Sequence, residues 1–187
     1  MARPVPTRIR LAVESLDLRP DARVLEVGAG TGVAAALLCR LVPEGHVTAL
    51  ERSGSAVAHA EQRLAPWLEA GVADIAESDL ARFHGDGRPY DVVLAINVNV
   101  FWAGEAAQAV DRLAELVAND GVVHLWFEPR RGTDSDRAAG AARVGHDAVA
   151  ALEAGGFEVA TEVIENIAHV VGRVRPTGGA DRGTQAS

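Results

Sequence analysis

The 187-residue sequence contains no lysine, so every basic side chain other than histidine is an arginine. It holds 18 arginines against 26 acidic residues, and its formal net charge is −8. A protein that binds DNA or RNA usually presents a face rich in positive charge. Because the arginines are scattered among acidic residues, we expect no nucleic-acid partner. Lysine codons are AT-rich, so the absence of lysine also suggests a GC-rich genome.

Cysteine is almost as scarce, with Cys39 as its single occurrence. One cysteine cannot form a disulfide within the chain, and this composition favours a reducing cytoplasm. No apolar run approaches the ~18 residues of a membrane span, and no apolar signal core follows the basic N-terminus. We therefore expect a cytoplasmic protein without a membrane partner. The six histidines and Cys39 lack the spacing of metal ligands, so we expect no metal site.

Apolar residues make up 48% of the chain, which is enough for one domain with a substantial core. Apolar segments typical of strands alternate with segments of helical periodicity. This alternation favours an α/β fold with a mostly parallel sheet. We expect one domain over residues 1–175 and a disordered tail over residues 176–187, which lack apolar content.

Proline, glycine and polar residues mark three boundaries in this pattern. Pro66 lies inside the helical segment that follows residue 53, and we expect it to kink or split that helix. Residues 119–121, Asn-Asp-Gly, are expected to turn into the fifth strand. Residues 129–140 are polar, arginine-rich and without periodicity, so we expect a surface loop there. A helix follows and ends near Ala154.

Residues 24–32 read Val-Leu-Glu-Val-Gly-Ala-Gly-Thr-Gly and carry the most information about function. They predict an apolar strand that runs into a glycine-rich turn, with a helix from Val33 to Leu41 directly after it. Sheets of the Rossmann type bind an adenosine cofactor at such a junction. The glycines let the backbone turn sharply and approach a ligand, and the first N–H groups of the helix suit a carboxylate or phosphate.

The spacing of these glycines distinguishes between cofactors. A dinucleotide site requires G-x-G-x-x-G, but Val33 stands where its last glycine would be, which disfavours a nicotinamide-dependent oxidoreductase. The spacing here is G-x-G-x-G, with Glu26 two residues before Gly28. This pattern closely resembles motif I of the class I methyltransferases that use S-adenosylmethionine.

The resemblance covers roughly residues 7 to 176. Residues 46–51 resemble the family's second strand, residues 89–97 the fourth and residues 121–129 the fifth. It implies the family's fold, a Rossmann-like three-layer sandwich with seven strands in the order 3-2-1-4-5-7-6 and an antiparallel last strand. It also implies S-adenosyl-L-methionine as cofactor and S-adenosyl-L-homocysteine as product.

The resemblance places several residues near the methionine part of the cofactor. Residues 28–30 would face it, and Glu26 would help to hold its ammonium group, directly or through water. Asn97 and Val98, where the fourth strand ends, would line the same part. The alternative is a strand-to-helix turn whose glycines serve packing alone.

Acidic residues would hold the other parts of the cofactor. Glu51 at the end of the second strand can accept hydrogen bonds from both ribose hydroxyls, or it is a solvated strand-end carboxylate. Arg52 would lie along the adenine or be exposed. Asp79 would accept from the adenine amino group, with Glu77 as its competitor. The predicted cofactor-binding residues are Glu26, Gly28, Ala29, Gly30, Gly32, Glu51, Arg52, Asp79, Leu80, Asn97 and Val98.

The acceptor pocket is expected to include Asn99, Phe101 and Trp102, in the loop after the fourth strand. For Phe101 and Trp102, packing into the core is an equal alternative. Glu128 ends the fifth strand and could orient or deprotonate an acceptor, or it could pair with Arg130 or Arg131. No sequence like Asn-Pro-Pro-Tyr is present, and in the family that motif accompanies methylation of amide or exocyclic amino nitrogens.

We interpret the chain as a small class I methyltransferase with a small-molecule acceptor, whose methylated atom is O, N or C. The alternative is an S-adenosylmethionine-binding module or partner subunit without methyl transfer, or other chemistry on the same fold. This alternative stays open because the motif binds the cofactor and does not itself transfer the methyl group. The sequence does not distinguish a monomer from a homodimer.

Overall fold

A seven-stranded sheet runs through the middle of the protein, whose computed structural model describes residues 4–101, 106–129 and 133–175. The strands lie in the order β3-β2-β1-β4-β5-β7-β6, so β3 and β6 form its edges. Neighbouring strands are parallel except around β7, which is antiparallel to β5 and β6. The predicted order and antiparallel last strand are confirmed. The strands are β1 (Arg23–Val27), β2 (His46–Glu51), β3 (Ala73–Glu77), β4 (Tyr90–Ile96), β5 (Val117–Phe127), β6 (Phe157–Ile164) and β7 (Ile167–Val174).

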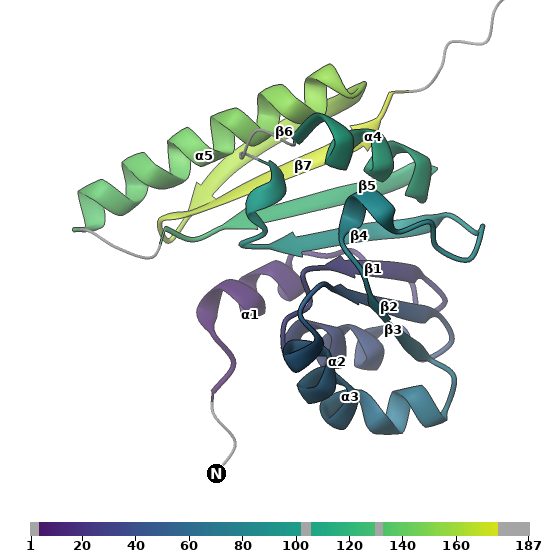
Figure 1. Ribbon diagram of the computed structural model, residues 1–187. Helices are drawn as coiled ribbons and strands as arrows, with labels where there is room; N and C mark the ends of the chain where they lie inside the picture. Colours follow the sequence, from purple (N-terminus) through teal and green to yellow (C-terminus); the bar gives the residue numbers. More distant parts are fainter. Residues whose placement is uncertain (1–3, 102–105, 130–132, 176–187) are drawn as a thin grey trace, which may run out of the picture.

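Helices cover both faces of this sheet and complete three layers (Figure 1). The first layer contains α1 (Thr7–Glu14), α2 (Val33–Leu41) and α3 (Gly54–Glu69), and the other contains α4 (Ala106–Leu116) and α5 (Asp134–Ala154). Two short 3₁₀ helices, η1 (Leu80–Arg82) and η2 (Asn99–Phe101), follow β3 and β4. The predicted Rossmann-like sandwich is confirmed. No helix in the described ranges has the length and apolarity needed to cross a bilayer.

The sheet separates two hydrophobic clusters, one under each layer of helices. On β5, Val123 and Leu125 join the cluster beneath α4 and α5, whereas Trp126 joins the cluster beneath α1 and α2. Successive side chains of a strand point to opposite faces, so a strand covered on both sides must be apolar at nearly every position. The burial of the whole of β1 after Arg23 follows from this arrangement.

Helix α5 begins within the region for which the sequence predicts a surface loop. That prediction is wrong from residue 134 onward. The hydroxyl of Thr133 accepts a hydrogen bond from the backbone N–H of Asp136 at 3.2 Å, and the Asp136 carboxylate accepts from the backbone N–H of Thr133 at 2.9 Å. This capping box satisfies the free N–H groups with which a helix begins. Small residues such as Ala138 and Ala139 follow. They differ too little in hydrophobicity from one face of the first turns to the other for the sequence to show a helical period.

Two further boundaries differ from expectation. Helix α3 is continuous through Pro66, so the predicted split does not occur. Pro66 lies near the end of the helix, where the missing N–H removes a single bond and its carbonyl still accepts from Ala70 at 3.2 Å. Strand β5 starts at Val117, before the predicted turn at residues 119–121. These residues form an irregularity in its pairing with β4, because Tyr90 pairs with Val117 whereas Val92 pairs with Val122.

Candidate active site

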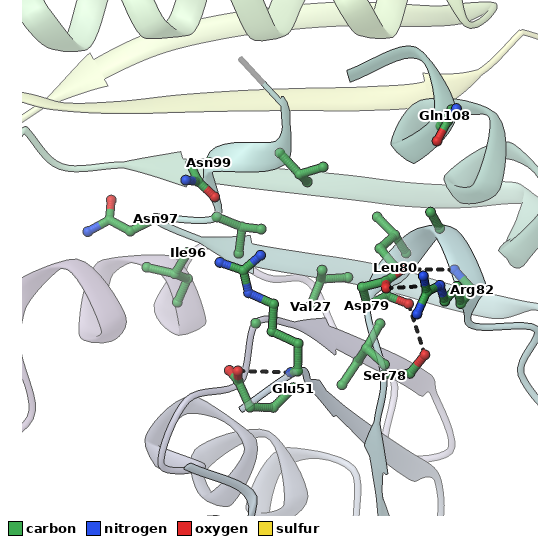
Figure 2. Close-up of a pocket in the computed structure, with 16 residues that line it drawn as sticks. Val27, Glu51, Ser78, Asp79, Leu80, Arg82, Ile96, Asn97, Asn99 and Gln108 are labelled. Atoms are coloured by element: carbon green, nitrogen blue, oxygen red, sulfur yellow. Dashed lines mark hydrogen bonds and ion pairs between the residues drawn. The ribbon is translucent and has the colours of Figure 1, made fainter. Parts of the chain in front are cut away.

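A cavity of about 540 Å³ opens at the carboxyl ends of β1, β2 and β4. The strand order reverses between β1 and β4, and in open α/β sheets ligands bind at such a switch point. Figure 2 shows the residues that line this cavity, which we call the first cavity; they come from the ends of β1, β2 and β4, from the segments that follow β3 and β4, and from α4. Eight of the predicted site residues line it: Gly28, Glu51, Arg52, Asp79, Leu80, Asn97, Val98 and Asn99.

The glycine-rich turn reaches the first cavity through Gly28. Its φ is +71°, and its N–H donates to the carbonyl of Leu50 at 2.8 Å. A Cβ at this position would lie 2.6 Å from Cγ2 of Val98, closer than real side chains approach one another. Only glycine therefore fits both the backbone conformation and the contact with Val98. Gly30 and Gly32 complete the turn with φ of +55° and +73° but do not line the cavity, and neither does Ala29.

Glu51 ends β2 and links the turn to α3. Its Oε2 accepts a hydrogen bond from the N–H of Gly30 at 2.8 Å, and its Oε1 accepts from the N–H groups of Arg52 and Ser53 at 2.9 Å each. A carboxylate offers about four acceptor positions, so three backbone donors leave capacity for a further hydroxyl. Glu51 is thus held in place as an acceptor at the cavity wall.

Glu26 lies behind the turn rather than in the cavity wall. The residue is only 4% exposed, and its Oε2 has no hydrogen-bond partner among the described residues. Burial raises the pKa of Glu26 to about 8; the charge of Glu51 adds to this, and a hydrogen bond from the Ala35 backbone opposes it. Without a ligand the group is therefore largely protonated at neutral pH, and a cation beside it would favour the carboxylate.

The far end of the first cavity is formed by residues that follow β3. Asp79 caps η1, because its Oδ1 accepts from the N–H of Arg82 at 3.0 Å, and Arg82 Nε lies 3.5 Å from Oδ2 (Figure 2). Glu77 does not line the cavity, so Asp79 is the acidic residue that the fold presents there. Gln108 of α4 also lines the cavity. The sequence does not predict Gln108 as a site residue, because it belongs to no motif and lies on a helix whose apolar pattern indicates only packing against the sheet.

A second cavity of about 480 Å³ lies beside the first and shares Asn97 and Asn99 with it. Asn97 has a φ of +57°, its N–H donates to the Trp126 carbonyl at 2.8 Å, and its Oδ1 accepts from the N–H of Glu128 at 2.7 Å. The backbone between the two cavities is therefore fixed to the end of β5. The lining of the second cavity comprises Asn97, Asn99, Phe127, Glu128, Pro129, Gly140, Arg143 and Val144.

Glu128, which lines the second cavity, forms an ion pair with a residue of the N-terminal helix α1. Arg8 Nη1 donates to Glu128 Oε2 at 3.1 Å, and the two side chains are 33% and 31% exposed. The predicted alternatives for this pairing, Arg130 and Arg131, lie outside the described residues. Arg8 was not predicted, since 120 positions separate it from Glu128 in the sequence.

The two aromatic residues predicted for the acceptor pocket have different outcomes. Phe101 is fully buried in the core under α4 and α5 and lines neither cavity, so its placement in the pocket is wrong. The large apolar side chain is buried more completely in the core than it would be in an open pocket. Trp102 lies outside the described residues.

The buried histidines form a separate group on β5 and β7. Nδ1 of His124 lies 3.1 Å from Nε2 of His169, whose Nδ1 lies 3.0 Å from Oε1 of Glu162. The ring of Trp126 stacks on His169 with 4.1 Å between centroids. Burial lowers the pKa of His124 to about 4, with further lowering by the neighbouring His169 and Arg173. None of these side chains lines either cavity, and His146 is exposed on α5.

Comparison with known proteins identifies the family. Residues 25–123 match the model of a methyltransferase domain family, and this stretch is more than half of the chain. The protein therefore belongs to that methyltransferase domain family. The family and the fold imply S-adenosylmethionine as the methyl donor.

A curated relative matches over part of the chain. Protein-L-isoaspartate O-methyltransferase 1 of Rhodopseudomonas palustris (strain HaA2) is 37% identical over 89 residues, which are 48% of this chain and 35% of the relative. The chain thus matches about a third of that relative's length.

Solved structures match over more of the chain at lower identity. The precorrin-6y C5,15-methyltransferase of Geobacter metallireducens GS-15 has a TM-score of 0.65 and 19% identity, over 89% of this chain and 87% of that one. The [4+2]-cyclase SpnF has a TM-score of 0.70 and 16% identity, over 89% and 80% of the two chains. At these identities the likeness concerns the fold alone.

Proposed function

We propose that the protein is an enzyme that transfers the methyl group of S-adenosylmethionine to a small-molecule acceptor. One observation carries the proposal: two adjoining cavities share Asn97 and Asn99, and the first is built on the motif turn and Glu51. An adenosine cofactor and an acceptor can then occupy neighbouring spaces. Methyl transfer requires this arrangement, since holding two reactants in contact is a large part of catalysis.

The residues around the first cavity are suited to S-adenosylmethionine. Glu51 would accept from a ribose hydroxyl at its remaining acceptor position, and Asp79 with Leu80 would contact the adenine. The orphan oxygen of Glu26 suits a cationic group nearby, because an ammonium supplies the missing donors, directly or through water. Asn97 and Val98 would line the methionine part. When bound, the cofactor supplies an already activated methyl group. The protein therefore has to bind the cofactor and the acceptor, orient them towards each other and exclude water.

Glu128 is proposed to orient the acceptor from the second cavity, through its fixed position beside Arg8 and Asn97. The named isoaspartate relative acts on a protein, so a protein-borne acceptor is the competing class. The matched part covers only about a third of that relative, so the match does not by itself carry the relative's acceptor over to this chain. The second cavity, lined by residues that follow β5 and by α5, has a volume of about 480 Å³, which is in the range of small-molecule sites and supports a small molecule instead. The buried free thiol of Cys39 is compatible with the proposed cytoplasmic location.

Two measurements test this function. S-adenosylhomocysteine should raise the melting temperature by linkage and bind in calorimetry, whereas NAD should do neither. Protein incubated with methyl-labelled S-adenosylmethionine and a metabolite extract should yield labelled small molecules. A shift with NAD and none with S-adenosylhomocysteine would contradict the cofactor. Labelled polypeptide without labelled metabolites would favour a protein acceptor.

A binding module without methyl transfer is the second candidate. Other chemistry on the same fold belongs to this alternative, and the fold-level match to a protein named as a [4+2]-cyclase supports it, because this architecture is not limited to proteins named methyltransferases. The same two measurements distinguish it: a module binds S-adenosylhomocysteine but transfers no label to any metabolite or protein.

A further inference from the structure

The second cavity presents hydrogen-bond donors and a cationic side chain. Asn97 uses its Oδ1 to accept from Glu128, so its Nδ2 is left as a donor. Arg143 enters the lining from α5, and its guanidinium has no hydrogen-bond or ion-pair partner in the described ranges. Glu128 is the one carboxylate among the described lining residues, and Arg8 already pairs with it. The polar lining therefore has a positive charge without a counter-ion.

The described lining of both cavities is also poor in the side chains that commonly act as a base near neutral pH. Their described lining contains no histidine, cysteine or tyrosine, and the chain has no lysine. The buried histidines lie elsewhere on the sheet. Alcohols and ammonium groups must lose a proton to become methylated, and an efficient base has a pKa near the working pH. A carboxylate needs no such base, because it is ionised well below pH 7.

We propose that the acceptor is a carboxylic acid, bound through Arg143 and the Asn97 amide and methylated on a carboxylate oxygen. This inference rests on the proposed methyltransferase function and names its acceptor class. A guanidinium matches a carboxylate through two parallel N–H···O bonds, and it can hold the acceptor in a defined orientation. Pro129 and Val144 supply apolar contacts in the same lining, which suits an apolar body attached to the acid.

The reaction balances without a proton acceptor. A lone pair of the carboxylate oxygen forms the bond to the methyl carbon, and the carbon–sulfur bond breaks with its electron pair left on sulfur. The products are a methyl ester and S-adenosylhomocysteine. The negative charge of the acid and the positive charge of the sulfonium disappear together, so no proton is released. In this scheme Glu128 is a positioning residue for the cavity wall and not a general base.

The chemistry of the labelled product tests the acceptor class. A carboxylate methyl ester is cleaved by mild base to volatile methanol, whereas methyl ethers, methylamines and C-methyl products keep the label. We expect most of the label transferred to a metabolite extract to become volatile after base treatment. Base-stable product would overturn the carboxylate inference and leave the proposed methyltransferase intact. No labelled product, with S-adenosylhomocysteine still bound, would overturn both.

Equilibrium binding tests the site independently of turnover. Hexanoate and its neutral amide, hexanamide, are matched probes for an apolar body with and without the charge. In calorimetry with S-adenosylhomocysteine-saturated protein, hexanoate should bind more tightly than hexanamide. Arg143→Gln should weaken hexanoate binding by about tenfold and leave hexanamide unchanged. Affinity for S-adenosylhomocysteine should stay at the wild-type value, because Arg143 does not line the first cavity.

Arg88→Gln is the matched control, since it removes one positive charge at the opposite end of β4, where Arg88 pairs with Asp86. It should leave the hexanoate affinity unchanged, and Arg143→Lys should restore part of it. Equal binding of the two probes, including no binding of either at millimolar concentration, would overturn the proposed site. Equal losses in Arg143→Gln and Arg88→Gln would also overturn it, because they would show a general charge effect.

Discussion

The first and second cavities are built in different ways. At the first, the backbone makes the site: Gly28 permits a turn that a side chain would block, and Glu51 is held by three backbone N–H groups. At the second, side chains from distant segments make it: Glu128 after β5 and Arg143 of α5 line the cavity, and Arg8 of α1 pairs with Glu128. A site made by the backbone tolerates few substitutions. A site made by side chains can change its ligand while the fold persists, as is known for folds that host many functions.

Gly28→Ala should have the largest effect, because it tests the backbone-built cavity directly. A positive φ costs a non-glycine residue about 1–3 kcal/mol, and crowding against Val98 adds about 1–3 kcal/mol. We expect the free energy of unfolding to fall by about 2–6 kcal/mol in urea titrations, with weaker S-adenosylhomocysteine binding.

Gly87→Ala is its matched control, since Gly87 has a φ of +82° with no atom within 4 Å of an added Cβ. This variant should lose only the stability that corresponds to the unfavourable backbone conformation. Adding Val98→Ala to the Gly28→Ala variant should restore part of the lost stability, because it removes the side chain that the new Cβ crowds. If Gly87→Ala and Gly28→Ala lose the same stability, contact with Val98 is not what requires glycine at position 28.

Glu51→Ala should come next, with cofactor affinity reduced by about 1–3 kcal/mol through loss of a charged acceptor. Calorimetry with S-adenosylhomocysteine measures this change. Some stability should also be lost, because the N–H groups of Gly30, Arg52 and Ser53 lose their acceptor. Unchanged affinity together with a large loss of stability would mean that Glu51 is structural only.

Two buried groups outside the cavity linings, Glu26 behind the turn and His124 on β5, should affect stability in opposite ways as the pH changes. Glu26 has its pKa raised from 4.5 to about 8 in the folded protein, so the folded state binds the extra proton between these values. Its contribution to stability is complete below about pH 4.5 and is lost as the pH rises towards 8. Glu26→Gln should therefore flatten the decline in melting temperature as the pH rises from about 4.5 to 8.

His124 should affect the acid side of the curve of melting temperature against pH, whereas Glu26 affects the alkaline side. Its pKa is lowered from 6.5 to about 4, so the unfolded chain binds more protons in that range and stability is lost as the pH falls. His124→Asn should flatten the acid limb and leave the alkaline limb unchanged. Melting curves of the two variants and the wild type across pH 4 to 8 check both limbs. If both variants change the pH dependence in the same direction, the opposite effects assigned to Glu26 and His124 are wrong.

Arg8→Gln should have the smallest effect on stability. The Arg8–Glu128 pair is about one third exposed, and such pairs contribute only about 0–1 kcal/mol. Arg10→Gln on the same helix is the control, because it breaks the more exposed pair with Glu14. Both variants should unfold within about 1 kcal/mol of the wild type in urea. A loss above about 2 kcal/mol in Arg8→Gln alone would mean that α1 depends on this contact.

The difference between the cavities also explains what could be predicted from the sequence. The alternation of elements and the motif around Gly28 predict the fold and the position of Glu51, because backbone requirements leave a local pattern. Arg143 and Gln108 carry no such pattern, since their place in a lining depends on how distant elements pack. Phe101 was ambiguous for a related reason: an aromatic residue after a strand reads equally as core or pocket, and only packing decides.

The two edges of the sheet have a consequence for assembly. Strand β3 carries the exposed Asp74 and Glu77, and strand β6 the exposed Glu158 and Glu162, while neither strand contains a basic residue. An edge strand with free backbone groups is a template for another chain, and charges on it prevent such pairing. Two copies that met edge to edge would bring carboxylates together with no arginine on these strands to neutralise them. The acidic edges thus act against sheet extension and aggregation, so contacts between copies through other surfaces are favoured over a continuous sheet.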